Sequence, residues 1–133
     1  MRKYRRHTQI VYALLVVFTI WLFNPVLAGG GDPEKAKQAW PMIQGGALLV
    51  DVRSQEEFSQ GNLDGAVNIE WDQTDALVAA IGNDKQRQVV FYCRSGNRAG
   101  KSIAVLESMG YTNIFNATGL EALLDTKPAT LNP

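Results

Sequence analysis

The sequence predicts an α/β fold in which a small parallel sheet is covered by helices on both faces. Short and almost wholly apolar runs, typical of strands buried on both faces, occur at 47–52 and 88–93. Each run is followed by a segment with helical character, and this alternation favours parallel strands joined by helical crossovers. With 133 residues, 46% of them hydrophobic and 20% charged, the chain has room for one such domain.

The first 28 residues are typical of an export signal. A basic start at 1–6 leads into an apolar stretch at 10–23, and 24–28 combines a helix-breaking Asn-Pro with the small residue that signal peptidase needs. This stretch of 14 residues is shorter than the roughly 20 that span a bilayer as a helix. We expect cleavage after Ala28 and a periplasmic domain. The alternative is an uncleaved N-terminal anchor that leaves the domain facing the periplasm.

The folded domain is expected over 33–125. A flexible, glycine-rich junction is expected at 29–32 and a loose tail at 126–133. Asp32 can cap the first helix, and Pro33 suits its first position.

The remaining elements alternate in the same way along the chain. Ser54 and Glu57 have the spacing of a capping box, so a helix is expected directly after the first strand. The later segments predict a strand at 66–69, helices at 72–81 and 98–109, a strand at 113–115 and a last helical turn at 119–124. On the helix at 98–109, the apolar side chains expected to face inward are Ile103, Val105, Leu106 and Met109.

The charge distribution argues against a nucleic-acid partner. The formal charge is zero, but four cations lie in the first six residues. Without them the chain has 9 Lys and Arg against 13 Asp and Glu, a net charge of −4. A mildly acidic body does not suit a phosphate backbone. Since the sequence shows no heptad pattern, a monomer is expected.

Cys93 is the only cysteine, so an intramolecular disulfide and a CxxC redox pair are both excluded. An unpaired thiol in an exported protein is either a small buried core residue or a reactive group. Its neighbourhood favours the second interpretation. Cys93 ends a buried strand directly before a helix, at the sheet edge where α/β proteins bind ligands.

The loop after Cys93 surrounds the thiol with positive charge. The backbone N–H groups of 94–98 can point into its concavity, Arg94 and Arg98 add formal charge, and Gly96 permits a tight curl. Such surroundings stabilise a thiolate.

The histidine content limits what this thiolate can do. His7, the only histidine, lies in the predicted signal, so neither Cys-His hydrolysis nor an ordinary zinc site is supported. No cofactor is expected. The chemistry left open is transfer of sulfane sulfur, transfer of phosphoryl, or reduction of an oxyanion such as arsenate.

Two stretches of the sequence resemble the single-domain rhodaneses, which are thiosulfate sulfurtransferases. The first, LLVDVRSQEEFSQGNLDGAVNI at 48–69, carries an Asp-x-Arg…Glu-Phe pattern at Asp51, Arg53, Glu57 and Phe58. The second, at 89–120, carries the sequence CRSGNR, and its loop residues are Cys93, Arg94, Ser95, Gly96, Asn97 and Arg98. With an export signal, the chain is most similar to the small periplasmic rhodaneses of the phage-shock protein E type.

The resemblance implies a rhodanese-like three-layer fold and a cycle in which Cys93 carries a persulfide. Thiosulfate would be the donor, cyanide or a thiol the acceptor, and Arg94 and Arg98 would steer and hold the anionic donor. Four residues separate Cys93 from Arg98. Related phosphatases and arsenate reductases place five there, which widens the loop for a tetrahedral oxyanion. A non-catalytic persulfide carrier is the other alternative.

The residues around the loop have expected supporting roles. Asp51 is expected to bond loop amides or Arg53, and Arg53 to pair with Glu57. Trp40, Trp71 and Tyr92 are expected to pack rather than to line an approach to Cys93. Asn62 departs from the family pattern, which usually has a histidine at that place in the turn, so any role of that histidine is in doubt here.

Overall fold

The computed structural model describes residues 30–131, and the predicted signal segment therefore lies outside the described part. Within 30–131, no helix is long and apolar enough to cross a membrane. Four parallel strands form one sheet in the order β2-β1-β3-β4. The strands are β1 (Leu48–Asp51), β2 (Val67–Asn68), β3 (Val89–Cys93) and β4 (Ile114–Gly119).

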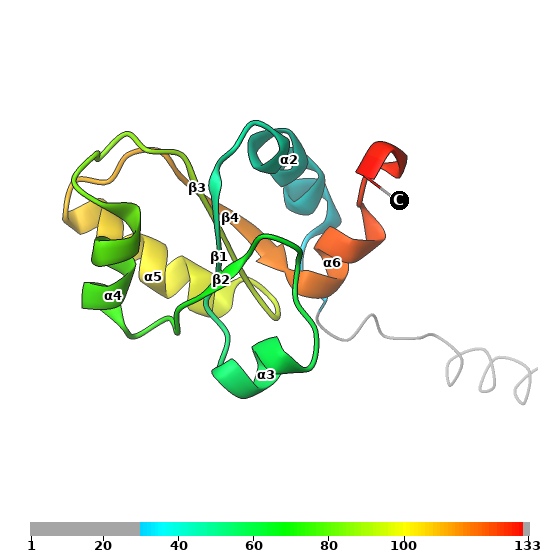
Figure 1. The fold of residues 1–133 in the computed structure, drawn as a ribbon, viewed down its shortest axis with the longest axis horizontal. Coiled ribbons are helices and arrows are strands. Elements are labelled where there is room, and N and C mark those ends of the chain that lie inside the picture. Colours follow the sequence, from blue (N-terminus) through cyan, green and yellow to red (C-terminus); the bar gives the residue numbers. More distant parts are fainter. Residues whose placement is uncertain (1–29, 132–133) are drawn as a thin grey trace, which may run out of the picture.

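Helices cover both faces of this sheet, which confirms the predicted three-layer α/β fold (Figure 1). The helices are α2 (Pro33–Gln44), α3 (Gln55–Ser59), α4 (Thr74–Ile81), α5 (Asn97–Ser108) and α6 (Leu120–Asp125), followed by a short 3-10 helix, η1 (Ala129–Leu131). Figure 1 shows α2 and α6 on one side of the sheet and α4 and α5 on the other. The short helix α3 lies at the end of the sheet where the loop before α5 turns.

Alternation along β3 divides the core into two halves. Val90 and Tyr92 pack with α2 and α6, whereas Val89, Phe91 and Cys93 face α4 and α5. All five residues of the strand are buried. Because β3 lies inside the sheet and is covered on both faces, the position of its last residue is tightly constrained.

The inward face of α5 differs from the prediction. Leu106 is buried and Ile103 packs at the edge of the core, but Val105 is 44% exposed and Met109 is 42% exposed. The buried stripe consists instead of Ala99, Ser102 and Leu106. Two of the three buried side chains in this stripe are small, so hydrophobicity alone placed Leu106 correctly but misplaced Val105 and Met109.

Two residues of the glycine-rich segment before α2 are hydrogen-bonded to the folded domain. The Gly30 carbonyl accepts a hydrogen bond from the backbone N–H of Ala122, and the Asp32 N–H donates to Thr118 Oγ1 at 2.9 Å. At the other end of the domain, Thr126 Oγ1 accepts a hydrogen bond from the Trp40 indole N–H at 3.2 Å.

Gly119 provides a sharp test of this packing. A Cβ built there would lie 2.1 Å from the Gly30 carbonyl oxygen and 2.3 Å from that of Arg94. Gly119→Ala should therefore lower the free energy of unfolding by about 2 to 3 kcal/mol, as overpacking does. The measurement is urea unfolding followed by circular dichroism.

Gly100→Ala is the matched control, because a Cβ at that helical position would meet only Asn116 Nδ2, at an ordinary 3.6 Å. It should be neutral or stabilising by up to about 1 kcal/mol. Equal losses of stability in the two variants would contradict the close approach at Gly119.

Candidate active site

The loop between β3 and α5 encloses the thiol. Gly96 has φ +101°, a left-handed conformation that favours glycine, and this conformation curls the chain back over Cys93. As a result the Gly96 N–H donates to Cys93 Sγ at 3.0 Å. Cys93 is only 1% exposed, so the sulfur lies at the base of the loop. The predicted position at the end of a buried strand is confirmed.

Arg98, in the first turn of α5, forms an ion pair with Glu57 of α3. Its Nη1 and Nη2 atoms donate to the two carboxylate oxygens of Glu57 at 2.7 and 2.8 Å. Glu57 also completes the predicted capping box, because its Oε2 accepts from the Ser54 N–H at 3.0 Å while Ser54 Oγ accepts from the Glu57 N–H. One carboxylate therefore starts α3 and ties α3 to the loop.

These contacts perturb the charges of both partners. The hydrogen bonds from Arg98 lower the pKa of Glu57 from 4.5 to about 2, with further help from Ser54. The same contact raises the pKa of Arg98 above its usual value. Both groups are thus charged throughout the neutral range, and the proximity of Cys93 also favours the charged form of Arg98.

The prediction that Arg53 pairs with Glu57 was wrong. Arg53 pairs instead with Asp51, whose two oxygens accept from Arg53 Nε at 3.0 Å each and whose Oδ2 accepts from Nη2 at 2.6 Å. Asp51 is fully buried, and a buried carboxylate requires a close counter-charge. Arg53 Nη2 also donates to the Gly61 carbonyl at 2.7 Å, so the pair links the end of β1 to the turn after α3.

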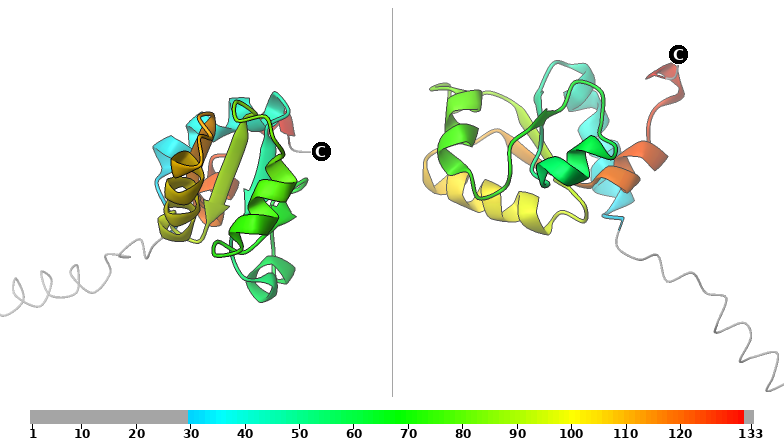
Figure 2. Two further views of the ribbon diagram at one scale, coloured as in Figure 1. Left: turned by 90° about the vertical axis from the view of Figure 1, so that its left-hand side faces the viewer. Right: turned by 60° about the horizontal axis from the view of Figure 1, so that its bottom comes forward.

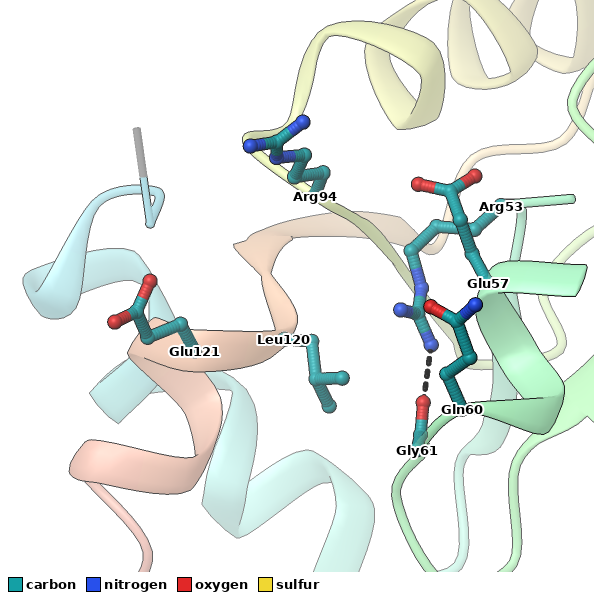
Figure 3. A pocket seen from close by; sticks show the side chains of 7 residues that line it. All are labelled: Arg53, Glu57, Gln60, Gly61, Arg94, Leu120 and Glu121. Atoms are coloured by element: carbon teal, nitrogen blue, oxygen red, sulfur yellow. Dashed lines mark hydrogen bonds between the residues drawn. The ribbon is translucent and has the colours of Figure 1, made fainter. Parts of the chain in front are cut away.

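A pocket of about 380 Å³ lies beside the loop. Figure 3 shows Arg94 at one end, Glu121 and Leu120 of α6 on one side, and the α3 residues on the other; the lining residues are Arg53, Glu57, Gln60, Gly61, Arg94, Leu120 and Glu121. Arg94 is exposed and its side chain makes no hydrogen bond or ion pair within residues 30–131. Cys93 does not line this pocket, because the loop encloses it.

The other loop residues have plainer positions. Ser95 and Asn97 are exposed, and Gly96 is buried. Of the three aromatic residues expected to pack, Trp40 and Tyr92 are core residues, whereas Trp71 is 36% exposed. The Tyr92 hydroxyl accepts from the Leu63 N–H at 3.1 Å, and burial raises the pKa of this phenol. Asn62 is exposed and donates to the Phe58 carbonyl at 2.9 Å, so at this position it closes the end of α3.

Sequence reasoning missed a group of residues on β4 that supports the loop from behind. Asn116 Nδ2 donates to the Gly96 carbonyl at 2.9 Å. A bulge follows, in which Phe91 faces Asn116 but Cys93 faces Gly119, and within it Thr118 has φ +69°. The motif at 116–119 offered a signal only through its polar residues inside an otherwise apolar strand.

The Glu57–Arg98 pair makes a prediction about pH. Glu57→Gln should lower the free energy of unfolding by about 1 kcal/mol at neutral pH, because it removes a two-point ion pair that is partly exposed. Since the folded pKa of about 2 lies below the unfolded value of 4.5, the wild-type advantage is complete above the unfolded pKa. It shrinks as the pH falls toward the folded pKa.

Urea unfolding at a series of pH values measures this difference. Glu56→Gln, an exposed neighbour on α3, is the control and should show no such pH dependence. A Glu57→Gln deficit that stays constant from neutral pH down to the acid limit of the transition would contradict the assignment.

Comparison with known proteins agrees with this geometry. The family model for the rhodanese-like domain matches residues 35–122. The chain is 36% identical over 72 residues to thiosulfate sulfurtransferase PspE of Escherichia coli (strain K12). This match covers 54% of this chain and 69% of PspE. A solved structure of a rhodanese with anions from E. coli superposes with a TM-score of 0.53 at 34% identity, covering 57% of this chain and 89% of that one.

A second group of relatives is much longer than this chain. The chain is 32% identical over 102 residues to the tRNA uridine(34) hydroxylase of Sodalis glossinidius (strain morsitans), a match that covers 73% of this chain but 28% of the relative. The chain therefore spans most of PspE but less than a third of this longer relative. Together with the parallel sheet and the loop around Cys93, these matches establish that the chain belongs to the rhodanese-like family.

Proposed function

We propose that this protein is a thiosulfate sulfurtransferase that works through a persulfide on Cys93. The observation that carries the proposal is the Gly96 N–H that donates to Cys93 Sγ at 3.0 Å, at the end of a buried strand and the start of α5. A backbone donor aimed at sulfur stabilises negative charge there without any base.

The reaction has two halves. The Cys93 thiolate attacks the outer sulfur of thiosulfate, a new S–S bond forms, and the original S–S bond breaks so that sulfite leaves with the electron pair. An acceptor nucleophile, cyanide or a thiolate, then attacks the outer sulfur of the persulfide. Cys93 leaves as a thiolate and is ready for the next cycle.

The two arginines of the loop have different surroundings, and we assign them different roles. Arg98 is engaged by both oxygens of Glu57, so its role is to hold the loop against α3. Arg94 is exposed and lines the pocket, and it is the cation of the loop that remains available to an anionic donor. We therefore assign donor binding to Arg94 alone and no longer to both arginines.

The alternatives are less well supported. The enclosed Cys93, with four residues between it and Arg98, leaves less room for a tetrahedral oxyanion than the longer loops of phosphatases and arsenate reductases. A carrier that only presents a persulfide would form the same intermediate and would differ in turnover. Hydroxylation of tRNA is not proposed, because the chain covers only 28% of that relative.

We further propose export to the periplasm with cleavage after Ala28, which N-terminal sequencing tests.

The intermediate can be observed by mass spectrometry. Incubation with thiosulfate should add the mass of one sulfur atom to the wild-type protein and nothing to Cys93→Ser. Addition of cyanide should remove that sulfur and release thiocyanate. An unmodified wild-type mass under these conditions would refute the proposal, and a persulfide that no acceptor discharges would favour the carrier.

Arg94→Ala should raise the KM for thiosulfate about tenfold, since a charge-assisted hydrogen bond to the donor is lost, and should change kcat much less. Lys101→Ala is the control, because Lys101 is an exposed cation on α5, the helix that follows the loop, and its Nζ lies 4.9 Å from the centroid of the Trp71 ring. Steady-state kinetics with thiosulfate and cyanide provide the measurement. Equal effects in the two variants would show that only the overall charge matters.

A further inference from the structure

Asn116 lies on β4, directly behind the persulfide loop, and joins it to the sheet. Its Nδ2 donates to the Gly96 carbonyl at 2.9 Å, and its Oδ1 accepts from the Thr118 N–H at 3.0 Å. The two contacts determine the orientation of the amide. A backbone N–H can only donate, so Oδ1 must face Thr118, and the amino group must then face the carbonyl of Gly96.

Gly96 is the residue whose position matters most for the sulfur. Its N–H donates to Cys93 Sγ, and its carbonyl accepts the first hydrogen bond of α5, from Gly100 at 2.9 Å. Gly96 has no side chain that could hold it, and a glycine at φ +101° has a wide conformational range. Within residues 30–131, Asn116 is the side chain that bonds the carbonyl of this glycine.

The surroundings of Asn116 are shaped for this contact. The bulge in β4 places two residues of that strand opposite one residue of β3, which displaces the end of β4 relative to Cys93. Gly100 leaves room for the amide, since even a Cβ at that position would lie 3.6 Å from Asn116 Nδ2. A polar side chain inside a strand, half-buried and with both ends of its amide bonded, is thus placed against the catalytic loop.

We propose that Asn116 is a positioning residue for sulfur release, acting through Gly96. The inference rests on the proposed persulfide cycle. In the persulfide the negative charge lies on the outer sulfur, and it returns to Cys93 Sγ when the acceptor attacks and the S–S bond breaks. The Gly96 N–H therefore bonds Sγ more strongly as the thiolate leaves than in the persulfide, and Asn116 keeps that donor in line.

Two substitutions separate this role from a structural one. Asn116→Asp is nearly isosteric and keeps an oxygen for the Thr118 N–H, but it replaces the donor with an acceptor that faces the Gly96 carbonyl. Asn116→Ala removes both contacts. Asn113→Ala is the matched control, because Asn113 Nδ2 also donates to a backbone carbonyl, that of Gln86 at 3.0 Å, just before β4 begins.

The experiment loads each variant with thiosulfate, removes the excess donor, and measures the rate at which cyanide discharges the persulfide. Both Asn116 variants should release sulfur on the order of tenfold more slowly than the wild type, and Asn113→Ala at the wild-type rate. The value of kcat/KM for thiosulfate should stay within about twofold, because it reports persulfide formation in the first half-reaction and Arg94 is untouched. A merely structural role would lower the urea midpoint without this separation of the release rate from kcat/KM for thiosulfate.

Wild-type release by Asn116→Asp would overturn the proposal, even if Asn116→Ala is slow, because the contact with Thr118 alone would then explain the effect. If the carboxylate prevents folding, Asn116→Ala decides the question, and a wild-type release rate in that variant overturns the proposal. A wild-type protein that forms no persulfide with thiosulfate would instead refute the proposed function.

Discussion

The two-point ion pair between Glu57 and Arg98 joins α3 to the start of α5, beside the loop that follows Cys93. Glu57 belongs to the short helix after β1, and Arg98 to the first turn of α5, so the contact joins segments 41 residues apart in the chain. Glu57 is bound from its own side by Ser54. Glu57 lies in the first turn of α3 and Arg98 in the first turn of α5. The pair therefore sets the distance between α3 and the loop that follows Cys93.

The sheet supplies the second constraint on the loop. β3 is buried on both faces and ends at Cys93, while its neighbour β4 ends one bulge later at Gly119. The loop therefore starts from a fixed point and rests against the end of a second strand. Turned with its lower end forward, the molecule shows α3, the start of α5 and α6 gathered at one end of the sheet (Figure 2, right). Charge and backbone geometry carry the chemistry proposed for this end.

The parts that could be predicted from the sequence are those whose cause is local. The buried strand before Cys93, the capping box at Ser54 and the tight curl at Gly96 follow from neighbouring residues, and the structure has all three. The choice between two nearby partners depends on burial, which a sequence does not show. Arg53 pairs with Asp51 because the fully buried Asp51 needs a counter-charge more than the partly exposed Glu57 does.

The remaining differences have the same origin. Asn116 could not be assigned a role from the sequence, because its partner Gly96 lies 20 residues away and is reached only through the pairing of β3 with β4. The exposed Val105 could not be recognised either, since α5 presents small residues to the sheet where apolar periodicity alone expects large ones. The wrong expectations concern contacts between elements, whereas the elements themselves were found.

The docking of Gly30 bears on how this domain can be joined to other polypeptides. Gly30 bonds the start of α6, and a Cβ on it would lie 2.9 Å from Glu121 Oε2, a carboxylate that lines the pocket beside Arg94. Gly30, the first described residue, thus lies beside the pocket that Glu121 and Arg94 line. An affinity tag or a fused domain placed ahead of Gly30 is attached next to the pocket, whereas one placed after η1 is attached to the opposite end of α6.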